Sequence, residues 1–232
     1  MSLAVLDRAD DRLPPRFAML ARFAVVLTAQ PWSLTGGVVD DFAEHGFGED
    51  AIEAAAGVVA VFNYLTRVAD ATGIEFDYES PLPAFEPDPD QHPEPRPSRE
   101  SWPVIDEQAR TSSRFRALSE GWRRWHDYVF ESDEPLTHRD RRLLARAAAE
   151  ESCDRWRADE LREYEPQNKS ESILDEFGRK LASAPWQMRP DDLDVLREAG
   201  HPETALLHAI AVVALQSAES RLAMGRAAAG GS

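Results

Sequence analysis

Cys153 is the residue best suited to covalent or redox chemistry, because it is the single cysteine among 232 residues. A cysteine attacks electrophiles as its thiolate, so nearby charges decide its reactivity. On a helix, Arg157 would stand one turn later and favour the thiolate, whereas Glu150 and Glu151 would disfavour it. These influences roughly cancel, and a lone cysteine among small residues is typical of a buried small side chain. A single cysteine also excludes an intrachain disulfide and a multi-cysteine metal site.

The other polar residues form no motif typical of a metal or cofactor site. No two histidines are four residues apart, and the sequence contains no His-Glu-x-x-His, no Gly-x-Ser-x-Gly and no glycine-rich phosphate loop. We therefore expect neither a metal nor a cofactor. Asn63, Arg67 and Asp70 share one stripe of a predicted helix. They form either a buried polar cluster with a helix–helix ion pair or the lining of a pocket.

These candidate residues lie within or between the two copies of an internal repeat. Residues 20–69 align without a gap on residues 174–223, at an offset of 154 positions with sixteen identities. Composition alone would give about three or four identities, so the alignment indicates duplication. The matched positions include Pro31 and Pro185, and Arg67 and Arg221.

Each copy predicts three helices, and the fold class is all-α because no alternating strand pattern or hairpin signal occurs. The spacing predicts helices over 17–30, 35–46, 49–72, 170–184, 190–199 and 203–226. Between the copies, two further helices are expected over 105–130 and 137–161.

Residues 81–103 hold eight of the sixteen prolines, so they predict an extended arm, which Phe85 and Trp102 would anchor to a groove on this subunit or a neighbouring one. A loosely held linker is the alternative. The expected organisation is a first half-domain over 1–80, the arm over 81–104, a near-complete domain over 105–226 that includes the second copy (170–226), and a flexible tail over 227–232.

The run from Val58 to Asp70, with its Phe-Asn-x-x-x-Arg-x-x-Asp ending, resembles the alkylhydroperoxidase D-like (carboxymuconolactone decarboxylase) superfamily, and its peroxidase-related branch in particular. The plan of helix, Pro turn, short helix, Gly and long buried helix is similar to the second half of that domain. The resemblance implies an all-α bundle of two pseudo-symmetric three-helix repeats and a homo-oligomer, with a dimer or a larger assembly both open.

The segment from Thr137 to Leu161 resembles the family's active-site helix, which carries Cys-x-x-Cys-x-x-x-His. The resemblance places Cys153 at the first cysteine, Trp156 at the second, Glu160 at the histidine and Arg142 at the family's glutamate. Reduction of peroxide by this family needs two thiols, which form a disulfide, and a proton relay. The Cys-x-x-Cys site is therefore expected to be degenerate, with Trp156, Asn63 and Arg67 as candidate pocket lining.

Three functions remain open at this stage. A family member with a decayed redox site would have a binding or structural role. A one-cysteine hydroperoxide reductase would use Cys153 with an external thiol, and Cys153 would then be accessible to solvent. A decarboxylase-like, non-redox enzyme would have a polar pocket beside the Cys153 helix. The resemblance does not identify a small-molecule substrate.

Net charge bears on partners and location. A formal charge of −16 argues against a nucleic-acid surface, which needs clustered Lys and Arg. No uninterrupted apolar run reaches the roughly 18 residues of a membrane span, and the N-terminus lacks a signal-peptide pattern. The sequence thus predicts a cytoplasmic protein without a membrane partner.

Overall fold

The computed structural model describes residues 13–34, 36–74, 92–105, 107, 110 and 116–230. All regular elements in these ranges are helical, which confirms the all-α class. Phe85 lies outside the described residues, so the first predicted anchor of the arm is not described.

The first copy folds into α2 (Pro15–Ala29), a 3₁₀ turn η1 (Pro31–Ser33), α3 (Gly37–Glu44) and α4 (Glu49–Thr72). Proline fits the first turn of a helix because the backbone donor it lacks has no partner there, and Pro15 and Pro31 both open their elements. Gly73 ends α4 with φ 65°, a left-handed conformation that glycine adopts without strain.

The second copy repeats this plan as α9 (Lys169–Ser183), η3 (Pro185–Gln187), α10 (Pro190–Glu198) and α11 (Glu203–Gly230). Adding 154 to the bounds of α2 and η1 gives the bounds of α9 and η3 residue for residue. The expected tail is wrong for residues 227–230, which continue α11. Their alanines pack against the first copy, and Ala228 is buried.

The remaining described helices are α6 (Arg116–Phe130), α7 (His138–Glu151) and α8 (Arg155–Glu160). The expectation of one helix over 137–161 is wrong, because the chain leaves the helical conformation between α7 and α8. The side-chain oxygen of Thr137 caps α7 by accepting from the Asp140 amide.

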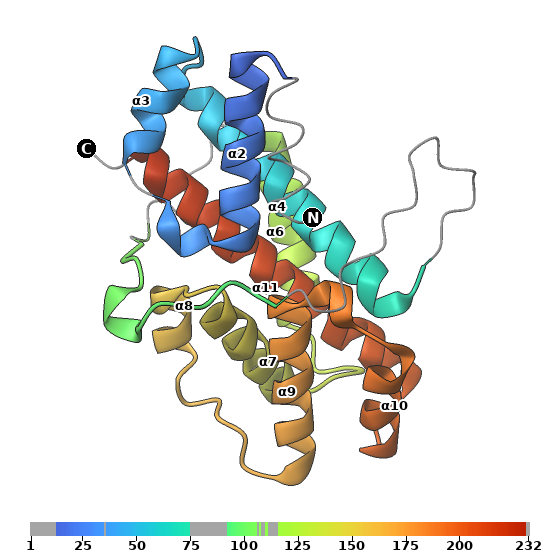
Figure 1. Cartoon of the computed structure of the whole chain (residues 1–232). Helices are drawn as coiled ribbons and strands as arrows, with labels where there is room; N and C mark the ends of the chain where they lie inside the picture. Colours follow the sequence, from blue (N-terminus) through green and yellow to red (C-terminus); the bar gives the residue numbers. More distant parts are fainter. Residues whose placement is uncertain are drawn as a thin grey trace.

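The two long helices α4 and α11 make the most extensive contact in the described chain, although about 150 positions separate them. Figure 1 shows the elements of the first copy on one side of α11, with α7, α9 and α10 on the other. Gly225 of α11 allows the close approach, since a Cβ there would lie 2.6 Å from the Cβ of Ala56 on α4. Such a contact cannot form without displacing one of the helices.

The described part of the arm has no regular secondary structure over residues 92–98 and forms a 3₁₀ turn, η2, at Arg99–Ser101. Trp102 is buried and packs beside Ala149, Cys153 and Ala158. Its indole nitrogen donates to the Pro97 carbonyl at 3.1 Å. This part of the arm therefore docks within its own chain, as one of the two predicted options.

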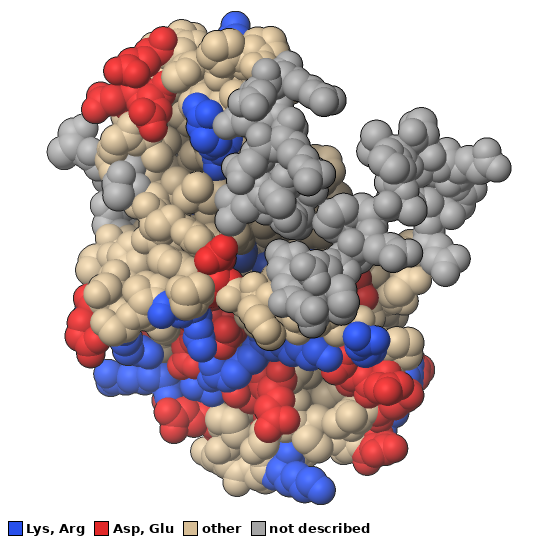
Figure 2. Space-filling model, viewed as in Figure 1, with Lys and Arg blue, Asp and Glu red and all other residues tan. Residues whose placement is uncertain are grey.

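The described chain has one helical stretch, Asp50–Thr72, that is long and apolar enough to cross a membrane. Its mean hydropathy is 1.3. The stretch contains no uninterrupted apolar run of about 18 residues, because polar residues such as Asn63 interrupt the apolar ones. Core helices of soluble proteins satisfy the same criterion. On the face drawn in Figure 2, Lys and Arg side chains gather in a band across the middle of the molecule, with Asp and Glu side chains along and within it.

Candidate functional site

Cys153 lies just beyond the end of α7 rather than on a helix. Its backbone has φ 56°, the one non-glycine residue with positive φ among the described residues. The Cys153 amide donates to the Glu150 carbonyl at 3.1 Å and the Asp154 amide to the Ala149 carbonyl at 2.9 Å. This pair of hydrogen bonds is the Schellman arrangement, in which a left-handed residue closes the helix. Glycine usually holds that position, so a cysteine there is conformationally costly.

The Cys153 side chain is fully buried, at 0% exposure, among Trp102, Ala149 and Ala158. Burial raises the pKa of the thiol to about 12, an effect that the charge of Arg96 opposes and that of Glu151 reinforces. The carboxyl end of α7, with its partial negative charge, also disfavours a thiolate. These surroundings keep the thiol protonated at neutral pH.

Buried polar side chains converge next to this cysteine, around Asp154. The Asp154 carboxylate forms an ion pair with Arg110, whose Nη1 donates to Oδ2 at 3.1 Å. It also accepts from the Ser220 hydroxyl of α11 at 2.8 Å and caps α8 by accepting from the Arg157 amide at 3.2 Å. The side chain is 0% exposed, so these donors replace water around a buried charge.

A second branch of this cluster runs through Gln216. Its amide nitrogen donates to the Ser220 hydroxyl at 3.1 Å, and its amide oxygen accepts from Nε of Arg157 at 3.0 Å. Arg157 also pairs with Glu160 at 2.5 Å, but its buried Nη2 has no hydrogen-bond partner. We call Arg110, Asp154, Arg157, Gln216 and Ser220 the Asp154 cluster.

The structure brings Glu160 and Trp156 to the edge of this cluster rather than to the thiol. Glu160 binds Arg157, and its side chain is 43% exposed. Trp156 is 40% exposed, and its ring lies 4.6 Å below the guanidinium of Arg110. The indole therefore covers the Arg110–Asp154 pair from outside and does not fill the space beside Cys153.

Arg142 is separate from both groups. It donates to Glu131 at 2.7 Å and to Nε2 of His138 at 3.2 Å, near the start of α7. Eleven residues of helical rise separate it from Cys153, which is roughly 16 Å. The two positions that the resemblance assigns to a proton relay and its thiol thus lie at opposite ends of α7.

Asn63 and Arg67 are both buried where the two copies meet. Nη1 of Arg67 donates to Oδ1 of Asn63 at 2.8 Å, and Nδ2 of Asn63 donates to the Thr28 hydroxyl at 3.0 Å. Burial lowers the pKa of Arg67 to about 10, an effect that the charge of Asp70 partly offsets. Arg67 makes no ion pair among the described residues, so hydrogen bonds rather than the expected ion pair hold this cluster together.

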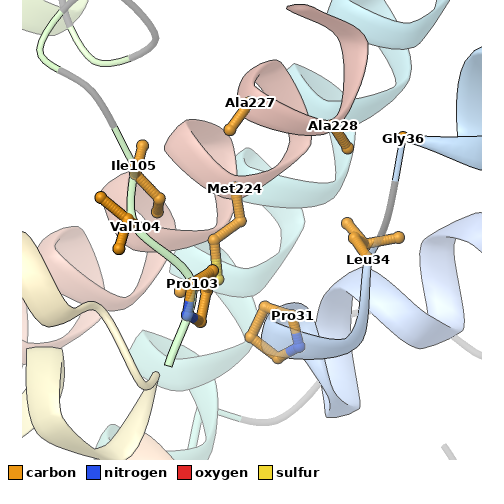
Figure 3. A pocket seen from close by; sticks show the side chains of 9 residues that line it. All are labelled: Pro31, Leu34, Gly36, Pro103, Val104, Ile105, Met224, Ala227 and Ala228. Carbon is orange, nitrogen blue, oxygen red and sulfur yellow. The ribbon is translucent and has the colours of Figure 1, made fainter. Parts of the chain in front are cut away.

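Two hollows occur at other places. One, of about 180 Å³, lies where Pro103 and Val104 of the arm and the adjoining Ile105 cross the end of α11 (Figure 3). No titratable side chain lines it. The other, of about 270 Å³, lies between α6 and the start of α11 beside Trp125, Tyr128 and His208. Neither contains a residue of the Asp154 cluster.

Sequence reasoning missed Asp154, Arg110 and Ser220. The readable signal was Asp154 itself, because aspartate is a favoured N-cap residue and so marks a candidate helix start. Its pairing with Arg110 spans 44 positions and depends on the tertiary structure.

Comparison with known proteins adds no relative. No family model matches the chain, no curated protein matches it, and no solved structure matches it.

Proposed function

We propose that this chain is a duplicated helical protein related by descent to the alkylhydroperoxidase D-like superfamily, in which thiol chemistry has been lost and the fold has a binding or structural role. The motif from Val58 to Asp70 and the repeated element plan support the descent. The observation that carries the functional part is the state of Cys153, which is buried, protonated and held in a left-handed turn.

A peroxide-reducing cysteine needs access to its oxidant and a partner that stabilises the thiolate. Cys153 has a carboxylate, Glu151, among the nearest charges, and Trp102 covers it. Because the helix is interrupted between α7 and α8, Trp156 does not lie one helical turn from Cys153. The geometry of a Cys-x-x-Cys helix is therefore absent even where the residues could be aligned.

Thiol labelling tests this proposal directly. The folded protein should react with a soluble disulfide reagent far more slowly than the unfolded protein, which gives the expected single thiol. Peroxide consumption with an added dithiol should be the same for the wild type and Cys153→Ser. Rapid labelling of folded protein, or turnover that Cys153→Ser abolishes, would establish the one-cysteine reductase instead.

A second candidate is non-redox catalysis of the decarboxylase type. The Asp154 cluster favours it, because two arginines and a carboxylate meet beside Cys153 and Nη2 of Arg157 lacks a partner. An unpartnered buried guanidinium nitrogen is suited to a carboxylate. Succinate should then raise the melting temperature of the wild type and not of Arg157→Gln. An unchanged melting temperature in both proteins removes this candidate.

We propose that the protein is located in the cytoplasm and that it binds neither nucleic acid nor membrane. The charge of −16 supports this, and the band of Lys and Arg in Figure 2 has Asp and Glu side chains along it, whereas both counterion release and attraction to anionic lipid need a basic surface. Retention on heparin, or flotation with anionic vesicles at moderate salt, would contradict it.

A further inference from the structure

One face of α4 exposes large apolar side chains at helical spacing. Val58, Val61, Phe62 and Leu65 are 58%, 42%, 62% and 51% exposed. They lie three and four positions apart, so they form one continuous stripe along the helix. We call these four residues the α4 stripe.

The internal repeat shows which elements cover the equivalent face of α11 in the second copy. The positions equivalent to Val58, Val61 and Phe62 in α11 are Val212, Leu215 and Gln216, and these are 0%, 0% and 1% exposed. Val212 and Leu215 pack in the main core with Leu143 and Leu144 of α7, and Gln216 binds Arg157 of α8.

The position equivalent to Leu65 is Glu219, which accepts hydrogen bonds from Trp122 of α6 and pairs with His126. The same helix face is thus covered by α6, α7 and α8 in the second copy. In the first copy α4 packs on α11, α2, α3, α9 and η3, and Tyr64 of α4 meets Trp125 of α6 edge to face at 6.3 Å, but the described chain contributes no counterpart of α7.

From Ala54 to Ala69, α4 has one charged residue, Arg67, and that side chain is 3% exposed because it turns inward. The stripe is therefore uncharged over about four turns. Apolar surface of this kind is favoured against a similar apolar helix, and each copy of the chain presents the same stripe. A two-fold axis then pairs a stripe with itself without burying a charge.

We propose that the α4 stripe is the interface of a two-fold symmetric dimer of this chain, with α4 of each subunit packed antiparallel against its counterpart. The partner's stripe takes the place that α7 and α8 occupy on α11. A membrane surface is a poorer occupant, since α4 has no exposed basic residue beside the stripe to meet lipid headgroups.

Sedimentation velocity of the full chain tests the interface. The wild type should be a dimer, and Phe62→Glu should weaken dimerisation by at least about 100-fold, because the symmetry places two like charges opposite each other. The matched control is Val195→Glu on α10, which adds the same charge at a 46% exposed valine and should leave the dimer intact. Circular dichroism of all three proteins should show the same helix content.

A cross-link checks the symmetry independently. In a Cys153→Ala background, Phe62→Cys should form a disulfide-linked dimer under mild oxidation, whereas Val195→Cys should not. A wild type that stays monomeric at all accessible concentrations overturns the proposal. So does a dimer that Phe62→Glu leaves unchanged, or a monomer that binds vesicles through the stripe.

Discussion

Arg67 and Arg221 make the same contact in opposite directions. Nη2 of Arg67 donates to the carbonyl of Ala182 at 2.8 Å, and Nη2 of Arg221 donates to the carbonyl of Thr28 at 2.9 Å. Thr28 and Ala182 are themselves equivalent, 154 positions apart. Each copy thus reaches into the other through the same residue at the same place, which is the self-complementary contact of a two-fold arrangement.

Each of these arginines should stabilise the protein, and the pair should be coupled. Burial, and secondarily the charge of Arg67, lowers the pKa of Arg221, so the two guanidinium groups repel each other. Arg67→Met and Arg221→Met each leave a carbonyl without its donor, at a cost of about 1–3 kcal/mol. Each single change also removes the whole repulsion between the two guanidinium groups, and this relief offsets part of its loss. The double variant gains the relief only once, so it should lose more stability than the sum of the two single variants. Urea unfolding of the four proteins measures this, and a double variant that loses less would contradict mutual repulsion.

Gly225 should be intolerant of a methyl group, because its Cβ would lie 2.6 Å from that of Ala56. Gly225→Ala should destabilise the fold by about 1–3 kcal/mol despite the better helix propensity of alanine.

Gly57→Ala is the matched control, since a Cβ at position 57 meets nothing within 4 Å. It should stabilise α4 by about 0.5–1 kcal/mol. Adding Ala56→Gly to Gly225→Ala should recover part of the loss in chemical denaturation. The same loss from both glycine changes would show that close approach is not the cause.

Cys153 should make the folded protein sensitive to alkaline pH. Because the thiol pKa rises from 9.0 to about 12 on folding, both states are protonated below about pH 9. Above that pH the unfolded thiol ionises while the folded thiol does not. Stability should then fall by up to about 1.4 kcal/mol per pH unit for this one group.

Denaturant unfolding of the wild type and Cys153→Ala between about pH 8 and 10 isolates this contribution. The unfolding free energy of the wild type should fall relative to that of Cys153→Ala as pH rises. Parallel curves would mean that the thiol ionises as easily in the folded state.

His126 should link α6 to α11 in a pH-dependent way. Partial burial opposes its protonation, but the hydrogen bond and charge of Glu219, 2.8 Å away, prevail and raise its pKa. A raised pKa in the folded state adds stability that is present below the ordinary value of 6.5 and is lost as pH rises through the folded value.

An NMR titration of the His126 ring measures that pKa. His126→Gln should lower the unfolding midpoint at about pH 6 and have a smaller effect at about pH 8. An equal effect at both values would assign His126 a packing role alone.

The repeated elements could be predicted from the sequence because apolar spacing, Pro31, Pro185 and the glycines recur at a fixed offset. The bounds of α4 agree with the prediction. The break after α7 was missed because no glycine or proline marks it, and Cys153 takes the left-handed position instead. The alignment of Trp156 and Glu160 on a helix shared with Cys153 failed for that reason.

The candidate site depends on contacts that local patterns do not encode. Asp154 could be read as a helix cap, but its pairing with Arg110 and Ser220 depends on how α11 crosses α8. Arg67 and Arg221 were visible as equivalent positions. That each crosses to the opposite copy follows only from the packing of α4 on α11.

The close packing of α4 on α11 has a consequence during synthesis. About 130 residues separate the end of α4 at Thr72 from the start of α11 at Glu203. At translation speeds of about 5–20 residues per second, α4 leaves the ribosome roughly 7–26 s before its main packing partner. During that interval both sides of α4 face solvent or other nascent chains. The nascent first copy should therefore depend on chaperones until α11 emerges.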